Sequence, residues 1–149
     1  MKNTKVSPQL VTMLNNALEN EHAIYVQYLS HAKTVKGVDA RLVNKRLRRI
    51  AGNHRFHQKK LRHLIADYLD AVPSMKMGKT FAANSVDSIL TTNMKCEGAA
   101  IDNYMKTITQ LDKEKNNLPY EYCKIEYALK KIIRTDQAHM AQLKKLAGG

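Results

Sequence analysis

The sequence predicts an all-α protein, a four-helix bundle with one long crossover between its second and third helices. Two observations predict this fold. The six glycines and three prolines fall mainly where an apolar period of 3.6 residues is interrupted. Two short connections and one long one separate the four amphipathic stretches. A chain of 149 residues, 44% of them hydrophobic, can bury one core, so we expect a single domain over residues 1–149.

The first half of the chain supplies two helices and the crossover. Ser7 is the expected N-cap of the first helix, with Pro8 in its first turn, and this helix should end near residues 36–37. The second helix is predicted from about residue 39 to residue 70. Residues 71–85, "AVPSMKMGKTFAANS", are too polar and broken for another such helix and predict the crossover.

The second half repeats the helix pair with a short turn. A third helix is predicted from about residue 85 to residue 111, and the charged stretch "DKEKNN" turns the chain. The fourth helix should start near Pro119 and end before Gly148.

Every predicted helix carries an inward apolar stripe that is broken near its middle by a carboxylate or an imidazole. If the helices pack together, these polar residues converge in the bundle core. They are Glu21, His54, His57, Glu97, Asp136 and His139.

A metal centre is the most economical explanation for this convergence. Burying three carboxylates without a positive partner would cost several kcal/mol each. Residues three apart share a helix face, so His54 with His57 and Asp136 with His139 can each bind an ion from one helix. Nitrogen and oxygen donors together suit iron, manganese or zinc better than calcium or magnesium. The glutamate and the histidine-ended pair occur in both halves of the chain, which predicts a two-metal site.

The alternative for any single member is a hydrogen-bonded core histidine or a carboxylate paired with an arginine. His22, His31 and His63 lie off the stripes, and we expect them to be solvated or to face a partner. Tyr25, Tyr28, Tyr68 and Tyr104 are expected in the core or an interface, although Tyr28 lies two turns from Glu21 on the same face and can reach the site.

Several function classes are excluded or disfavoured by composition. No window approaches ~18 to 20 uninterrupted apolar residues, and the start "MKNTKVSPQL" lacks the apolar stretch of a signal peptide, so we expect a soluble, cytoplasmic protein with no membrane partner. Cys96 and Cys123 are expected to be reduced, part-buried thiols.

The predicted second helix is strongly basic. A solvated face is the first interpretation, and the sharper one is a patch for nucleic acid or an anionic partner, whose binding would be non-specific and salt-dependent. The stretch 40–66 has no acidic residue and nine basic ones: Arg41, Lys45, Arg46, Arg48, Arg49, Arg55, Lys59, Lys60 and Arg62.

These segments resemble bacterioferritin, within the ferritin-like superfamily of di-iron carboxylate bundles. The resemblance rests on "LENEHAIYVQYLSHA" around Glu21 and Tyr28, on "YLDAVPSM" at the end of the second helix, and on "IIRTDQAHMAQL" in the fourth. It implies a ferritin-like fold and a ferroxidase site formed by Glu21, His57, Glu97, Asp136 and His139. The helix spacing described above adds His54 as a metal ligand. The resemblance also implies two iron ions per subunit, Fe(II) and dioxygen or peroxide as reactants, and a homo-oligomer, typically a 24-subunit shell that stores ferric mineral.

The sequence departs from the family pattern at three positions. His54 stands where the family has a bridging glutamate, and Asp136 stands where it has a second one. Arg55 stands where haem-containing members have the haem-ligating methionine, so haem is not predicted. Because an imidazole cannot bridge two metals as a carboxylate does, three outcomes stay open: slower ferroxidase chemistry, a single bound ion, or static metal binding. The alternative function is a non-catalytic metal-binding or nucleic-acid-associated (DNA-protecting) ferritin-like protein.

Overall fold

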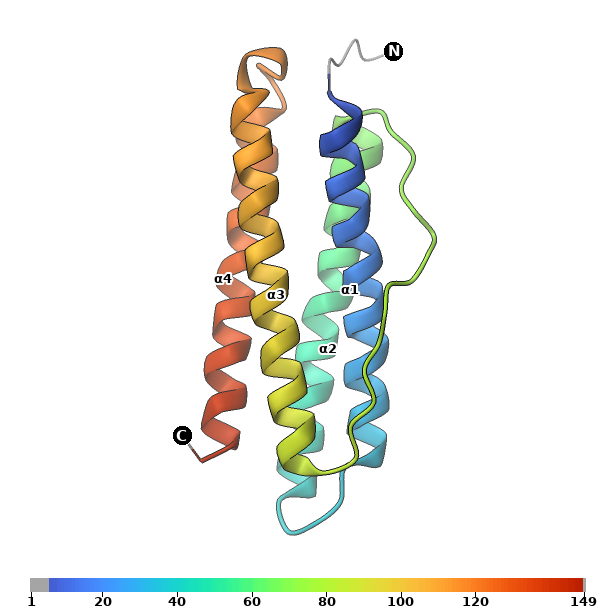
Figure 1. Cartoon of the computed structure of the whole chain (residues 1–149), viewed down its shortest axis with the longest axis vertical. Coiled ribbons are helices and arrows are strands. Elements are labelled where there is room, and N and C mark those ends of the chain that lie inside the picture. The colour runs from blue at the N-terminus through green and yellow to red at the C-terminus, as the bar shows by residue number, and fades with distance from the viewer. Residues whose placement is uncertain (1–5, 149) are drawn as a thin grey trace.

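The computed structural model describes residues 6–148, which form four long helices and no strand (Figure 1). The predicted all-α four-helix fold is confirmed. Met1–Lys5 and Gly149, which the predicted domain includes, lie outside the described residues. The elements are α1 (Pro8–Thr34), α2 (Ala40–His63), the π-helical turn η1 (Leu64–Tyr68), α3 (Val86–Lys113), the 3-10 turn η2 (Lys115–Asn117) and α4 (Tyr122–Leu146).

The ends of α1 follow from local chemistry. The Ser7 hydroxyl accepts a hydrogen bond of 3.0 Å from the Leu10 amide, as predicted for an N-cap, and Pro8 stands in the first turn. The helix ends at Thr34, slightly earlier than predicted, because the backbone of Val35 is extended. Gly37 then turns the chain toward α2 with a φ of 115°, a conformation that favours glycine.

The second predicted helix is confirmed in extent but changes character before its end. Regular α-helix stops at His63, and η1 continues the chain with wider backbone bonds, such as the one from the Leu69 amide to the Leu64 carbonyl at 3.1 Å. The fourth helix starts at Tyr122, three residues later than predicted, because η2 and a turn extend the connection.

The crossover, residues 69–85, runs along α1 (Figure 1). Asn15 donates to the Val72 carbonyl at 3.1 Å and accepts from the Ser74 amide at 2.7 Å. The Gly78 amide donates to the Glu19 carbonyl at 2.9 Å, and a side chain at Gly78 would meet that carbonyl at 3.2 Å. Because the crossover returns the chain to the far end, α3 runs parallel to α2 and antiparallel to α4 (Figure 1).

His31 corrects one prediction, since the structure buries it where we expected a solvated or partner-facing histidine. Four hydrogen bonds form a closed ring that holds the crossover. The Phe81 amide donates to Gln27 Oε1 (2.7 Å), Gln27 Nε2 to Asn93 Oδ1 (2.8 Å), Asn93 Nδ2 to His31 Nδ1 (2.9 Å) and His31 Nε2 to the Phe81 carbonyl (3.0 Å). The crossover thus supplies partners that the periodicity of α1 alone could not reveal.

Two other side-chain predictions meet mixed outcomes. His63 is exposed and pairs with Asp67, as expected for a residue off the stripe, and His22 is half-buried. Both cysteines are free thiols, but Cys123 is exposed and only Cys96 is part-buried. Cys123 lies in the first turn of α4, two residues before Ile125, the first buried residue of that helix.

Candidate metal centre

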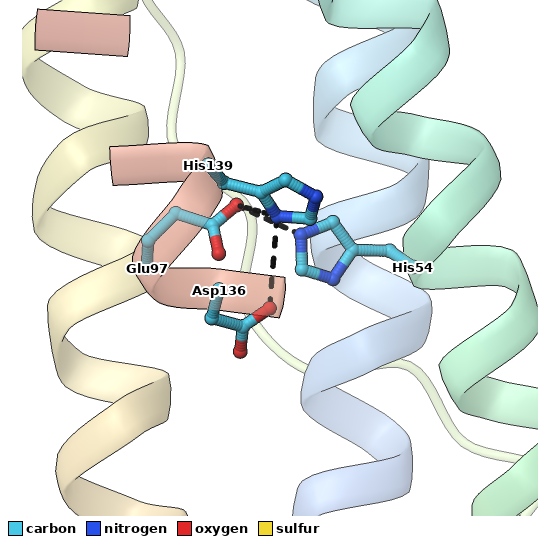
Figure 2. A group of neighbouring side chains, drawn as sticks. All are labelled: His54, Glu97, Asp136 and His139. Atoms are coloured by element: carbon cyan, nitrogen blue, oxygen red, sulfur yellow. Dashed lines mark hydrogen bonds and ion pairs between the residues drawn. The ribbon is translucent and has the colours of Figure 1, made fainter. Parts of the chain in front are cut away.

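All six polar residues predicted for the core meet in one buried cluster at mid-height of the bundle. Each of the four helices contributes, and none of the six side chains is more than 4% exposed. Figure 2 shows four of them pointing toward one another from α2, α3 and α4. The cluster consists of Glu21 on α1, His54 and His57 on α2, Glu97 on α3, and Asp136 and His139 on α4.

His54 lies between the two glutamates and uses both of its ring nitrogens. Nδ1 is 2.6 Å from Glu21 Oε1 and Nε2 is 2.8 Å from Glu97 Oε2. Two carboxylates on opposite sides favour the doubly protonated ring, in which both nitrogens donate. The doubly protonated ring is positive, and it pairs with one glutamate from each half of the chain.

The other two histidines face the carboxylates through Nδ1. His57 Nδ1 lies 3.4 Å from Glu21 Oε2 and 3.8 Å from Asp136 Oδ1. His139 Nδ1 lies 3.2 Å from Glu97 Oε2 and 3.6 Å from the same Asp136 oxygen. Asp136 Oδ1 therefore stands between the two imidazoles, close to both but hydrogen-bonded to neither.

Two tyrosines hold the glutamates from the opposite half of the chain. The Tyr28 hydroxyl, on α1, donates to Glu97 Oε2 at 2.6 Å, and the Tyr104 hydroxyl, on α3, donates to Glu21 Oε2 at 2.6 Å. We expected Tyr28 to reach the site, and it does. The role of Tyr104 was missed, although both tyrosines follow their own helix's glutamate by seven residues, two helical turns on the same face.

The ionisable groups of the cluster shift one another's pKa values. Burial and the nearby Glu97 and Glu21 raise the pKa of Asp136 to about 9. Burial acts in the same direction on Glu21 and Glu97, but the adjacent imidazoles, His54 foremost, outweigh it and hold the pKa of both glutamates below the usual range. Burial opposes charge on His54, but the two glutamates raise its pKa well above 6.5.

The donor set fits a transition metal. Five buried polar atoms of the cluster have no hydrogen-bond partner among the described residues, which is costly unless something positive binds them. Two overlapping groups offer ligand atoms that lie within 4.8 Å of one another, and imidazole nitrogens mixed with carboxylate oxygens suit iron, manganese or zinc. The groups are Glu21 with His54 and His57, and His54 with Glu97, Asp136 and His139.

Asn53 is a neighbour that the sequence did not single out. Its Nδ2 lies 2.9 Å from His139 Nε2, the ring nitrogen turned away from the carboxylates. An amide nitrogen donates, so Nε2 accepts in this contact and Nδ1 of a neutral His139 carries the ring proton toward the carboxylates. A metal on Nδ1 moves that proton to Nε2, and the Asn53 amide must then present its oxygen to accept it. Asn53 is exposed and stands off the inward stripe, so periodicity assigns it to the solvent.

These features define a four-helix bundle with a buried carboxylate and histidine centre that is shared by all four helices. The model of the ferritin-like domain family, "Ferritin", matches residues 11–148, nearly the whole chain, and the protein belongs to this family. Its fold is similar to the crystal structure of a ferritin-like di-iron carboxylate protein from Bacillus anthracis strain Ames. That similarity has a TM-score of 0.83 at 22% identity and covers 95% of this chain and 99% of the other.

The chain matches no curated protein sequence. None of the helices in residues 6–148 is long and apolar enough to span a membrane.

Proposed function

We propose that this protein binds iron at a di-metal site within each subunit, oxidises Fe(II) there and contributes to iron storage. One observation carries the proposal: the cluster holds two overlapping groups of buried donors, and five atoms of these groups have no hydrogen-bond partner among the described residues. Membership of the ferritin family and the fold shared with a di-iron carboxylate protein support the same chemistry.

Each half of the centre supplies one position. Glu21 and His57 would hold the first ion, and Glu97 and His139 the second. Asp136 can serve both, because its Oδ1 lies 3.8 Å from His57 Nδ1 and 3.6 Å from His139 Nδ1. Each bound Fe(II) would give up one electron to dioxygen or peroxide.

His54 limits the affinity of both positions. It already binds one oxygen of each glutamate at 2.6 and 2.8 Å, so a metal ion must compete with an imidazole for these carboxylates. We infer weaker binding than a carboxylate at this position would give, and His54 becomes a ligand only if its ring leaves one glutamate.

Anaerobic titration with Fe(II), followed by air, tests the proposal. Binding of two ions per chain, with oxidation much faster than that of free Fe(II) in the same buffer, is the expected result. Uptake of one ion that air does not oxidise any faster would contradict it. The related proposals of a homo-oligomeric shell and a cytoplasmic location are tested by a sizing column and by cell fractionation.

His54→Glu separates the role of this residue from that of the rest of the centre. A glutamate restores the carboxylate and its ability to bridge, so iron stoichiometry and oxidation rate should both rise. The metal-free variant should be less stable, because Glu21 and Glu97 lose their positive partner and a third carboxylate joins them, and metal should restore its melting temperature. A variant that loses stability and gains no iron would mean that His54 is only a structural link.

A second candidate, static metal binding with association to nucleic acid, is favoured by two specific observations. His54 partners both glutamates without a metal, and α2 has nine basic residues and no acidic one. If the protein binds DNA, gel retardation should disappear between about 50 and 200 mM salt, since each phosphate contact adds to the salt dependence.

A further inference from the structure

A small recess opens between α2 and α4 directly outside the metal centre. His57, which is otherwise buried, is one of its lining residues, together with the half-buried Thr135. The recess has a volume of about 110 Å³, below the roughly 300 to 1,000 Å³ of sites for drug-sized ligands, so it suits a small ion. The remaining lining residues are Phe56, Lys60, Lys124, Tyr127, Ala128, Lys131 and Ile132.

The lining is positive. Three lysines and no acidic residue surround the recess, and none of the three forms an ion pair with another described residue. Lys131 and Lys124 are exposed, and Lys60 is half-buried. Their surroundings add to the positive field: α2 has no acidic residue, and on α4 only Glu126 and the buried Asp136 oppose six basic residues, whereas α1 and α3 each carry more acidic than basic residues.

His57 and His139 differ in the partner of the ring nitrogen that faces away from the carboxylates. His139 has Asn53 as a hydrogen-bond partner for its outer nitrogen, Nε2. In His57, Nδ1 faces Glu21 and Asp136, so Nε2 is the outer nitrogen, and it makes no hydrogen bond among the described residues. Thr135 stands in α4 where Asn53 stands in α2, one residue before the central ligand position, but its hydroxyl donates to the Lys131 carbonyl at 3.1 Å.

We propose that this recess binds a small inorganic oxyanion, such as phosphate, which accepts a hydrogen bond from His57 Nε2 and pairs with Lys60 and Lys131. The anion occupies the position beside His57 that Asn53 occupies beside His139, but it accepts from Nε2 where Asn53 Nδ2 donates. By accepting this proton it fixes the His57 imidazole with an unprotonated Nδ1 toward the metal position. Lysine ammonium groups are common phosphate partners, and the aromatic side chains of Phe56 and Tyr127 bound the recess. The site adjoins the proposed iron centre but can be filled without it.

Calorimetric titration of the metal-free protein with inorganic phosphate, at constant ionic strength, tests this site. We expect saturable binding of one phosphate per chain. Lys60→Gln with Lys131→Gln should weaken it about tenfold or more, which is the effect of losing ~1.4 kcal/mol. The matched control is Lys59→Gln with Lys130→Gln, which removes the same charge from neighbouring, exposed positions of the same helices and should change the affinity less than about twofold.

Imidazole nitrogen NMR gives an independent readout. Phosphate should shift the Nε2 resonance of His57 and leave that of His139 unchanged, and Thr135→Asp, which places a carboxylate beside His57, should abolish the shift. Equal loss of affinity in both double variants, or no shift at His57, would overturn the proposal in favour of diffuse surface charge. A short single-stranded oligonucleotide that shifts His57 where phosphate does not would also overturn it. Because the protein is metal-free, these results do not depend on the iron proposal.

Discussion

The two halves of the bundle supply the metal centre by one pattern, yet without a metal the first half leaves one polar atom without a hydrogen-bond partner and the second half leaves four, among the described residues. In each half the first helix carries a glutamate and, seven residues later, a tyrosine that holds the other half's glutamate. The second helix of each half carries two residues three apart, of which the last is a histidine. The equivalent pairs are Glu21 and Glu97, Tyr28 and Tyr104, His54 and Asp136, and His57 and His139.

The difference lies at one pair of equivalent positions. His54 brings a positive ring to the glutamates, whereas Asp136 brings a third acidic group, whose pKa is raised by burial and by Glu97 and Glu21. Of the five cluster atoms without a hydrogen-bond partner among the described residues, four belong to the second half, and only His57 Nδ1 belongs to the first. The second half therefore gains more from a metal, and we expect it to bind the tighter ion.

Removal of one terminal histidine should break the comparison most visibly. His139→Ala should abolish the tighter binding event, while His57→Ala should remove the weaker one and leave about one ion per chain. Metal analysis after titration with Mn(II) or Fe(II) under argon measures both. His63→Ala, on the exposed surface, is the control and should keep wild-type stoichiometry. Equal losses in the two variants would show that the halves bind metal equivalently.

The outer partner of His139 gives the next largest effect. With a metal on Nδ1, His139 Nε2 carries the ring proton and the Asn53 amide turns its oxygen to accept it. Asn53→Ala removes this partner and should lower metal affinity by about 10-fold, the smaller end of what outer-partner substitutions cause. Thr135→Ala changes the equivalent residue in the other half, which makes no such bond, and should leave affinity within about twofold in phosphate-free buffer. If Thr135→Ala weakens metal binding as much as Asn53→Ala, Asn53 does not support its histidine more than Thr135 does.

The pH dependence of stability sharpens the same comparison. Asp136 has a pKa of about 9 in the folded protein and an ordinary value of 3.8, so between these values the folded state holds a proton that the unfolded state releases. Its unfavourable burial therefore costs more stability as pH rises. The pKa of His54 is raised above 6.5, so the stability that it contributes is complete below 6.5 and is lost as pH rises. Both effects have the same sign.

The melting temperature of the metal-free protein should thus fall from about pH 6.5 to about pH 9. Asp136→Asn should flatten the fall, because the neutral amide does not titrate. With Mn(II) bound the fall should shrink, since the ion binds the ionised carboxylate and its affinity rises with pH. A metal-free protein that becomes more stable over this range would mean that Asp136 is ionised in the fold.

The fold and the cluster could be predicted because both follow from local periodicity. Every stripe of the four helices is interrupted at the same height, and a polar residue at an inward position must meet whatever the neighbouring helices place there. The helix period and the order of the elements were enough to predict that Glu21 and Asp136 share a centre.

What could not be predicted depends on contacts between distant residues. The sequence assigned His54 as a metal ligand, but which of its nitrogens is available depends on a ring orientation that Glu21 and Glu97 set from other helices. His31 was assigned to the surface because its partners, Asn93 and the Phe81 backbone, come from α3 and the crossover. Asn53 could not be singled out, because its partner lies on α4.

The tyrosine pair gives the smallest and most discriminating effect. Tyr28 donates to Glu97 Oε2, an oxygen that also binds His54 Nε2 at 2.8 Å, so Tyr28→Phe leaves that oxygen with a partner. Tyr104 is the only hydrogen-bond donor to Glu21 Oε2 among the described residues, since His57 Nδ1 lies 3.4 Å away without forming such a bond. Tyr104→Phe therefore leaves a buried carboxylate oxygen unsatisfied.

Loss of a shared bond should cost about 0.5 to 1.5 kcal/mol, and an unsatisfied buried acceptor about 1 to 3 kcal/mol, so Tyr104→Phe should be the more destabilising change. Urea unfolding of the metal-free variants measures both values, and an unchanged dependence on denaturant shows that the folded state is preserved. Tyr127→Phe, at a side chain that is 65% exposed, is the control and should lie within about 0.5 kcal/mol of the wild type. If Tyr28→Phe is the costlier variant, His54 does not hold Glu97 in the metal-free protein, and its ring must already be turned toward a metal position.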